Sequence, residues 1–190
     1  MEYVISVAGD PSSAIGAAQL LMGEDDTLVS VAMGPERMNP VLEETVSGGA
    51  SKAFRIMDPE FMGSDSWVLS RIYAAFVDEY CNGPGLIIFN KFSSVVPMLS
   101  HLLQVQQFCY VREIGRDDGG IYVIQDYGGE ERKCRVPEGS VISLAEGASM
   151  PYSKKDSDAA IEVIGRKELK LAEPSVGIRG SRVVTVGECS

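Results

Sequence analysis

The chain has 190 residues, and hydrophobic residues make up 45% of them, which is typical of a globular protein and excludes an intrinsically disordered one. Its formal net charge of −10 argues against binding to nucleic acid through the phosphate backbone. No apolar stretch is long enough to span a membrane, and the first residues lack the basic start and cleavage site of a signal peptide, so we expect a cytoplasmic protein.

The negative charge is concentrated in the first half of the chain. Residues 1–90 hold 13 acidic and 4 basic residues, whereas residues 91–190 hold 14 and 13. An acidic surface of this kind either attracts a basic partner and excludes others, or keeps the protein in solution without binding anything. Both interpretations remain open at the level of the sequence.

Strands and helices are expected to alternate in the first 60 residues. One helix is predicted to start at a cap formed by Ser12 or Ser13, and a second to cover 34–46. This rhythm is typical of a parallel sheet with right-handed crossover connections. The strands, predicted from short apolar runs rich in β-branched residues, are 3–8, 27–33 and 52–57.

The next segment predicts the clearest helix of the chain. Ser64 or Asp65 can cap it, and Val68, Ile72 and Phe76 fall on one face at helical spacing. That face is therefore expected to pack on the sheet.

A fourth strand is predicted over 86–89. The polar turn 90–94 follows it and is expected to cap a helix over 95–103, with Pro97 in the first turn, where a missing N–H costs little.

The pattern changes after residue 104. Short strands now follow one another, and the turn sequences at 117–120 and 127–129 are typical of hairpins. We therefore expect antiparallel hairpins appended to the parallel sheet. The strands predicted in this part are 108–114, 120–124, 133–136 and 141–144, followed by two late strands, 160–164 and 182–186.

Residues that could carry metal or hydrolytic chemistry are sparse. The four cysteines are widely spaced and His101 is the sole histidine, so a metal site with nitrogen and sulfur ligands is not expected. Neither a nucleophile-elbow sequence nor a histidine-based zinc motif occurs. Hydrolytic mechanisms therefore have no support in the sequence.

Several segments follow one another in a recognisable order. The hairpin 126–129 precedes the strand 141–148, which ends in small residues, and the acidic and apolar strand 160–164 comes next. Segment 181–188 carries valines followed by glycine, and upstream 89–100 reads as strand, turn and helix. This order and spacing resembles the N-terminal domain of electron transfer flavoprotein alpha subunits, and the resemblance covers essentially the whole chain.

The resemblance implies the fold. It predicts one domain over 1–190, of the α/β class, with a doubly wound, mostly parallel sheet that is adenine nucleotide alpha hydrolase-like or Rossmann-like. The hairpins would form a small antiparallel sheet appended to it.

The resemblance also carries an expectation about FAD. Glu188 stands where the family usually has an arginine, at the entry to its FAD-binding half, and only Cys189 and Ser190 follow. The family's flavin contacts would come from that half, so we expect this chain alone to hold no cofactor and FAD to be bound only in a complex.

Related proteins bind AMP or ATP at the carboxyl ends of the central strands, where such sheets place ligands. Here no glycine-rich phosphate loop follows the first strand, and capping and turn formation by themselves explain the polar residues at both positions adequately. The candidate residues at this edge are Gly9 and Asp10 after the first strand, and Asn90, Lys91, Ser93 and Ser94 after the fourth.

Three functional hypotheses follow. In the first, the chain is an electron-transfer or scaffold component rather than an enzyme, and it pairs with a beta-type electron transfer flavoprotein subunit or a separate FAD domain. In the second, it is a stand-alone AMP- or ATP-binding protein of the same superfamily. In the third, it self-associates as a homodimer in place of such a partner.

Overall fold

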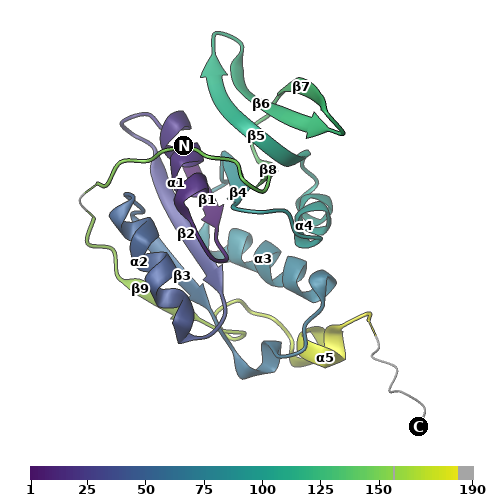
Figure 1. Ribbon diagram of the computed structural model, residues 1–190. Helices are drawn as coiled ribbons and strands as arrows, with labels where there is room; N and C mark the ends of the chain where they lie inside the picture. Colours follow the sequence, from purple (N-terminus) through teal and green to yellow (C-terminus); the bar gives the residue numbers. More distant parts are fainter. Residues whose placement is uncertain (156, 184–190) are drawn as a thin grey trace.

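The computed structural model describes residues 1–155 and 157–183, which form a nine-stranded sheet with helices on both faces (Figure 1). The strand order is β7-β6-β5-β8-β4-β1-β2-β3-β9. Along this spatial order, all neighbouring pairs in β5-β8-β4-β1-β2-β3-β9 are parallel. The two remaining pairs, β5–β6 and β6–β7, are antiparallel. The strands are β1 (Glu2–Ser6), β2 (Thr27–Met33), β3 (Lys52–Ile56), β4 (Leu86–Phe89), β5 (Gln107–Asp117), β6 (Gly120–Tyr127), β7 (Glu130–Arg135), β8 (Ser140–Leu144) and β9 (Ile161–Ile164).

The predicted doubly wound, mostly parallel sheet is confirmed, but the place of β8 was predicted wrongly. Instead of closing a set of antiparallel hairpins, β8 lies between β4 and β5 and is parallel to both. All five of its residues are buried. A strand covered on both faces belongs in the interior of a parallel sheet, so the hairpin strands continue the main sheet through β5.

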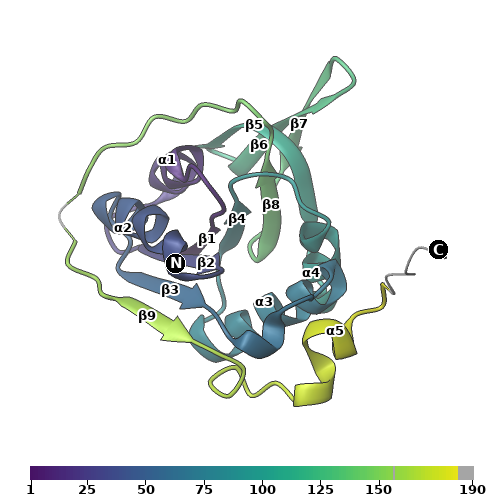
Figure 2. The same cartoon turned by 60° about the horizontal axis from the view of Figure 1, so that its bottom comes forward.

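Helices cover both faces of the sheet (Figure 2). Successive residues of β1 point to opposite faces, so Tyr3 and Ile5 pack with α1, and Val4 packs with α3 and α4. Two hydrophobic cores result, one on each side. The helices are α1 (Ser12–Leu21) and α2 (Asn39–Ser47) on one face, α3 (Ser66–Tyr80) and α4 (Val95–Leu103) on the other, and the short α5 (Gly177–Gly180), with 3₁₀ turns at Glu36–Met38, Pro59–Phe61 and Glu173–Ser175.

The helix caps were predicted correctly in one case and wrongly in another. Asp65 caps α3, because its carboxylate accepts a hydrogen bond from the N–H of Val68. Neither Ser12 nor Ser13 caps α1 with its side chain. Instead, the Asp10 carboxylate accepts from the N–H of Ser12 at 2.9 Å, since Ser12 already lies in the first turn.

The connection from β8 to β9 is an extended segment that we call the strap, residues 145–155 and 157–160 (Figure 2). It crosses the outer side of α1 and α2, where a helix would normally complete a parallel crossover. The Ser13 hydroxyl donates to the carbonyl of Ala148 at 2.5 Å, and the Gln19 amide exchanges hydrogen bonds with the backbone of Ser153. Further hydrogen bonds join Tyr152 to Glu44, Lys155 to Ser47 and Ser157 to Ala50.

The late strand predicted over 160–164 is confirmed as β9, which pairs with β3 at one edge of the sheet. The other late strand, predicted over 182–186, lies mostly outside the described residues. Its described part, Arg182 and Val183, is not in a strand.

Asp65 also fixes the segment after α5. Its carboxylate accepts hydrogen bonds from the N–H groups of Arg182 at 2.7 Å and Val183 at 3.1 Å, in addition to Val68. These bonds, with the Val68 contact first, hold the pKa of Asp65 below its usual range. The Arg182 guanidinium lies 4.2 Å from the ring centroid of Trp67, which adds a cation–π contact.

Asp65→Ala is expected to release this segment and to destabilise the fold by about 1 kcal/mol, the usual cost of a lost cap. Trypsin should then cleave at Arg182 several times faster than in the unmodified protein, whereas Asp65→Asn, which keeps a side-chain acceptor, should change the rate less. A depressed carboxyl pKa stabilises the fold above the unfolded-state pKa, and this contribution is lost as the pH falls through the folded-state pKa. The stability difference between the unmodified protein and Asp65→Ala should therefore shrink below about pH 4. Equal cleavage rates in all three proteins would contradict the role given to Asp65.

Candidate functional site

The strand order places a topological switch point between β1 and β4. From β1 the chain proceeds to β2 and β3 on one side, and it returns through α3 to β4 on the other. The loops after β1 and β4 therefore diverge, which is where doubly wound sheets bind ligands. A cleft of about 740 Å³ lies at this point, and its lining includes Asp10, Ser13, Asn90, Lys91, Phe92, Tyr110 and the 145–148 segment.

The side chain of Asn90 joins the two loops. Its Oδ1 accepts a hydrogen bond from the N–H of Ala8 at 3.1 Å, and its Nδ2 donates to the carbonyls of Ala8 at 3.1 Å and Asp10 at 2.9 Å. The backbone N–H of Asn90 donates to Ser6. Both amide protons and the amide oxygen are thus engaged within the protein, so Asn90 serves first to hold the cleft in shape.

The loop after β1 contains the other two predicted residues of that strand end. Gly9 has a φ of +85°, and an added side chain there would meet open space, so its role is conformational. Asp10 accepts hydrogen bonds from the hydroxyl and the N–H of Ser12, which lower the pKa of its carboxyl group. Asp10 is therefore held in its ionised form at the edge of the cleft.

The residues predicted after β4 divide into two groups. Lys91 is exposed and lines the cleft with Asn90. The Ser93 hydroxyl accepts from the N–H of Val95 at 3.2 Å, and the Ser94 hydroxyl lies 2.6 Å from that of Ser66, between the starts of α4 and α3. Ser93, Ser94 and Gly9 are not among the residues that line the cleft. That any of these residues binds a nucleotide stays a prediction.

The sequence model of the electron transfer flavoprotein domain matches residues 12–169. The chain belongs to this family. The match spans α1 through β9, including the strap, and it confirms the resemblance on which the sequence interpretation rested. No curated protein matches the chain.

This electron transfer flavoprotein-related chain has aromatic cleft residues that the sequence analysis did not identify. The rings of Phe92 and Tyr110 are stacked, with centroids 4.6 Å apart and planes 23° from parallel. They come from the loop after β4 and from β5. Phe92 was within the turn already singled out, but nothing in the sequence near Tyr110 indicates that its strand would reach this edge.

Tyr110 occupies an unusual backbone conformation. Its φ is +57°, in the left-handed region that bulky side chains rarely adopt. The cause is a β-bulge: β5 advances three residues from Phe108 to Val111 while β8 advances two. Such strain costs on the order of 1–3 kcal/mol and concentrates at functional sites.

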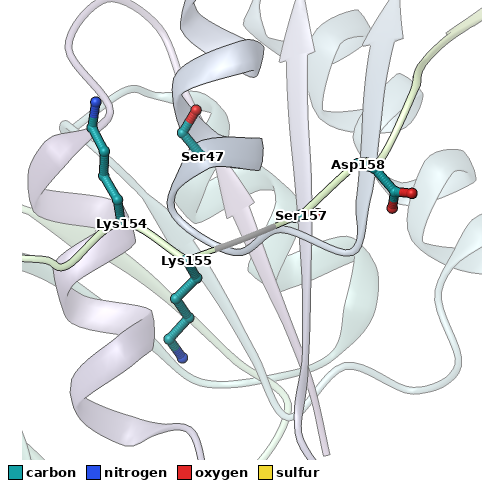
Figure 3. A pocket seen from close by; sticks show the side chains of 5 residues that line it. All are labelled: Ser47, Lys154, Lys155, Ser157 and Asp158. Atoms are coloured by element: carbon teal, nitrogen blue, oxygen red, sulfur yellow. The ribbon is translucent and has the colours of Figure 1, made fainter.

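A second hollow, of about 530 Å³, lies where the strap passes the end of α2 (Figure 3). Lys154 and Lys155 line it with Ser47 and Asp158. Figure 3 shows the two lysine side chains extending in opposite directions from the strap, so their charges do not converge on one point. This arrangement is unsuited to holding an anion.

Other chemistry finds little support in the part of the chain that the structure describes. Cys81, Cys109 and Cys134 are free, and burial raises the pKa of Cys81 to about 12 and that of Cys109 above its usual value, which makes both thiols poor nucleophiles. Among the described residues no cluster of three metal-ligating side chains is present, and no helix is long and apolar enough to cross a membrane.

Proposed function

We propose that this chain is a partner-binding component of an electron transfer flavoprotein and that it binds FAD only in a complex. Membership of the family supports the electron-transfer context. The proposal that the chain alone binds no FAD rests on the switch-point cleft. The polar groups there that a nucleotide would need form hydrogen bonds within the protein instead. Asn90 is the clearest case, since its whole amide group bonds to the backbone of the neighbouring loop.

The loop after β1 supports the same conclusion. A nucleotide phosphate is usually held by several free backbone N–H groups at the start of a helix. Here the segment before α1 is Gly9-Asp10-Pro11, in which proline has no N–H and the carboxylate of Asp10 bonds to the first residue of the helix. A negative charge at this position repels phosphate.

Exposed apolar side chains near α5 support binding to a protein. Met62 is 75% exposed, Ile178 is 76% exposed and Val183 is 72% exposed. Met62 and Ile178 line one shallow hollow of about 230 Å³. Exposed apolar side chains that lie together indicate a protein interface, whereas apolar side chains scattered singly over a surface are common.

The partner that we propose is a beta-type electron transfer flavoprotein subunit or a separate FAD domain from the same organism. Co-expression with each candidate, followed by light scattering and a visible absorption spectrum, tests the proposal. We expect a colourless protein when the chain is purified alone and a stoichiometric complex with one partner. Stoichiometric FAD on the chain alone, or a stable homodimer that binds neither candidate, would overturn it.

A second candidate function is binding of AMP or ATP. The volume of the cleft and the stacked pair of Phe92 and Tyr110 favour it, because a purine ring stacks well on aromatic side chains. Calorimetry with AMP, ATP and FAD decides between the two: heat with AMP or ATP at one site per chain would favour the nucleotide, and no heat would remove this candidate.

A further inference from the structure

The cleft at the switch point combines an aromatic platform with acidic side chains. Phe92 is 41% exposed and Tyr110 is 45% exposed, although their rings are stacked on each other. Asp10 and Glu146 line the same cleft from the loop after β1 and from the start of the strap. The two stacked rings and the two carboxylates thus lie along one cleft and stay open to solvent.

The backbone at Tyr110 has a conformation that tyrosine rarely adopts. The left-handed conformation of Tyr110 and the bulge in β5 aim its ring at Phe92. A glycine or asparagine would adopt the same backbone more easily. A tyrosine at this position is therefore best explained by what its ring contacts.

The charges of the cleft select the ligand. Asp10 is kept ionised by its hydrogen bonds with Ser12, and among the described residues Glu146 has neither an ion pair nor a side-chain hydrogen bond. Within the part of the chain that the structure describes, Lys91 is the one basic residue in the lining. Two carboxylates against one ammonium group disfavour a phosphate-bearing ligand and favour a cation.

We propose that the cleft receives an arginine side chain of the protein partner, with the guanidinium group stacked on the Phe92–Tyr110 pair and neutralised by Asp10 and Glu146. Arginine fits this combination because its planar cation stacks on aromatic rings and pairs with carboxylates, whereas lysine does only the second well. The acidic first half of the chain would attract a basic partner surface before contact. This inference rests on the partner-binding function proposed above.

The test is an NMR titration of the ¹⁵N-labelled protein with the blocked peptide Gly-Gly-Arg-Gly-Gly, the matched lysine peptide and AMP. The arginine peptide is expected to bind in the millimolar range and to shift amide signals of residues 8–10, 91–92, 110 and 145–148. The lysine peptide should bind at least about three-fold more weakly. Glu146→Gln and Phe92→Leu should each weaken binding of the arginine peptide by about three-fold or more. Glu24→Gln, which makes the same charge change in the loop after α1, should leave the affinity for the arginine peptide unchanged.

Three results would overturn the inference: no shifts at the cleft, equal binding of the two peptides, or tighter binding of AMP at these residues. The amide spectrum of each variant shows directly whether it is folded. The co-expression experiment separates the two proposals. If Glu146→Gln and Phe92→Leu form the complex as well as the unmodified chain, the arginine site is wrong and the partner role stands. If the unmodified chain forms no complex, the proposed function fails, and the titration still reports on the cleft.

Discussion

Gly16→Ala is expected to destabilise the protein by about 2 kcal/mol, although alanine is the better helix former. In the interior of an isolated helix this change would stabilise by about 1 kcal/mol. In the folded protein, however, a Cβ on Gly16 would lie 2.6 Å from the carbonyl carbon of Met150 and closer still to its oxygen. The obstacle is backbone, so the strap must move, and overpacking of this kind typically costs about 1–3 kcal/mol.

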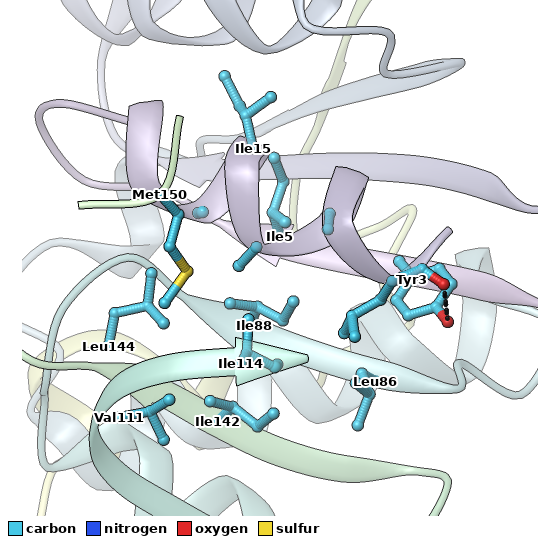
Figure 4. Close-up of a cluster of buried hydrophobic side chains, with 14 of the residues drawn as sticks. Tyr3, Ile5, Ile15, Leu86, Ile88, Val111, Ile114, Ile142, Leu144 and Met150 are labelled. Carbon is cyan, nitrogen blue, oxygen red and sulfur yellow. Dashed lines mark hydrogen bonds between the residues drawn. The ribbon is translucent and has the colours of Figure 1, made fainter. Parts of the chain in front are cut away.

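Displacing the strap at Met150 has further consequences. Figure 4 shows the Met150 side chain reaching from the strap toward Leu144, with Ile15 of α1 farther away in the same view. All three belong to one buried cluster. The strap also bonds to α1 on either side of Gly16, through Ser13 and Gln19. Movement at one point therefore disturbs both a core contact and flanking hydrogen bonds.

Thermal unfolding measures this effect, and we expect a midpoint about 4–8 °C lower for Gly16→Ala. Leu20→Ala is the matched control, since Leu20 lies on the same helix with its side chain 55% exposed, and it should change the midpoint little. An increase in stability for Gly16→Ala would show that helix propensity outweighs the contact with the strap.

Asn90→Ala is expected to destabilise the protein by about 2 kcal/mol. The substitution removes three hydrogen bonds between the loops after β1 and β4. Each such bond contributes on the order of 1 kcal/mol, and the sum is reduced here because water can reach the groups that lose their partner. The amide signals of Ala8 and Asp10 should also shift, because the cleft loses the bond that holds its two sides together.

Lys91→Ala is the control for this substitution. Lys91 is the next residue, is exposed and makes no ion pair among the described residues, so its loss should change stability by less than about 0.5 kcal/mol. Chemical denaturation of both variants compares them directly. Equal stability of the two would mean that the loops are positioned by their strands and that Asn90 is free to bind a ligand.

The candidate site was only partly accessible from the sequence. Of the six residues predicted at this edge, Asn90, Lys91 and Asp10 line one cleft, because the carboxyl ends of parallel strands meet there. That they bind a ligand stays a prediction. Tyr110 could not be found in the same way. It reaches the cleft only because β8 inserts beside β4 and brings β5 with it, and because a bulge turns its ring toward Phe92.

By itself, the sequence determined the alternation of strands and helices, the parallel character of the sheet and the family, because these depend on local apolar patterns and on the order of elements. Only the tertiary structure decided three features that depend on contacts between distant segments. It placed β8 inside the sheet, it laid the strap across α1 and α2, and it engaged the Asn90 amide with the neighbouring loop. No local pattern encodes these contacts, since each joins segments that are brought together only when the sheet has formed.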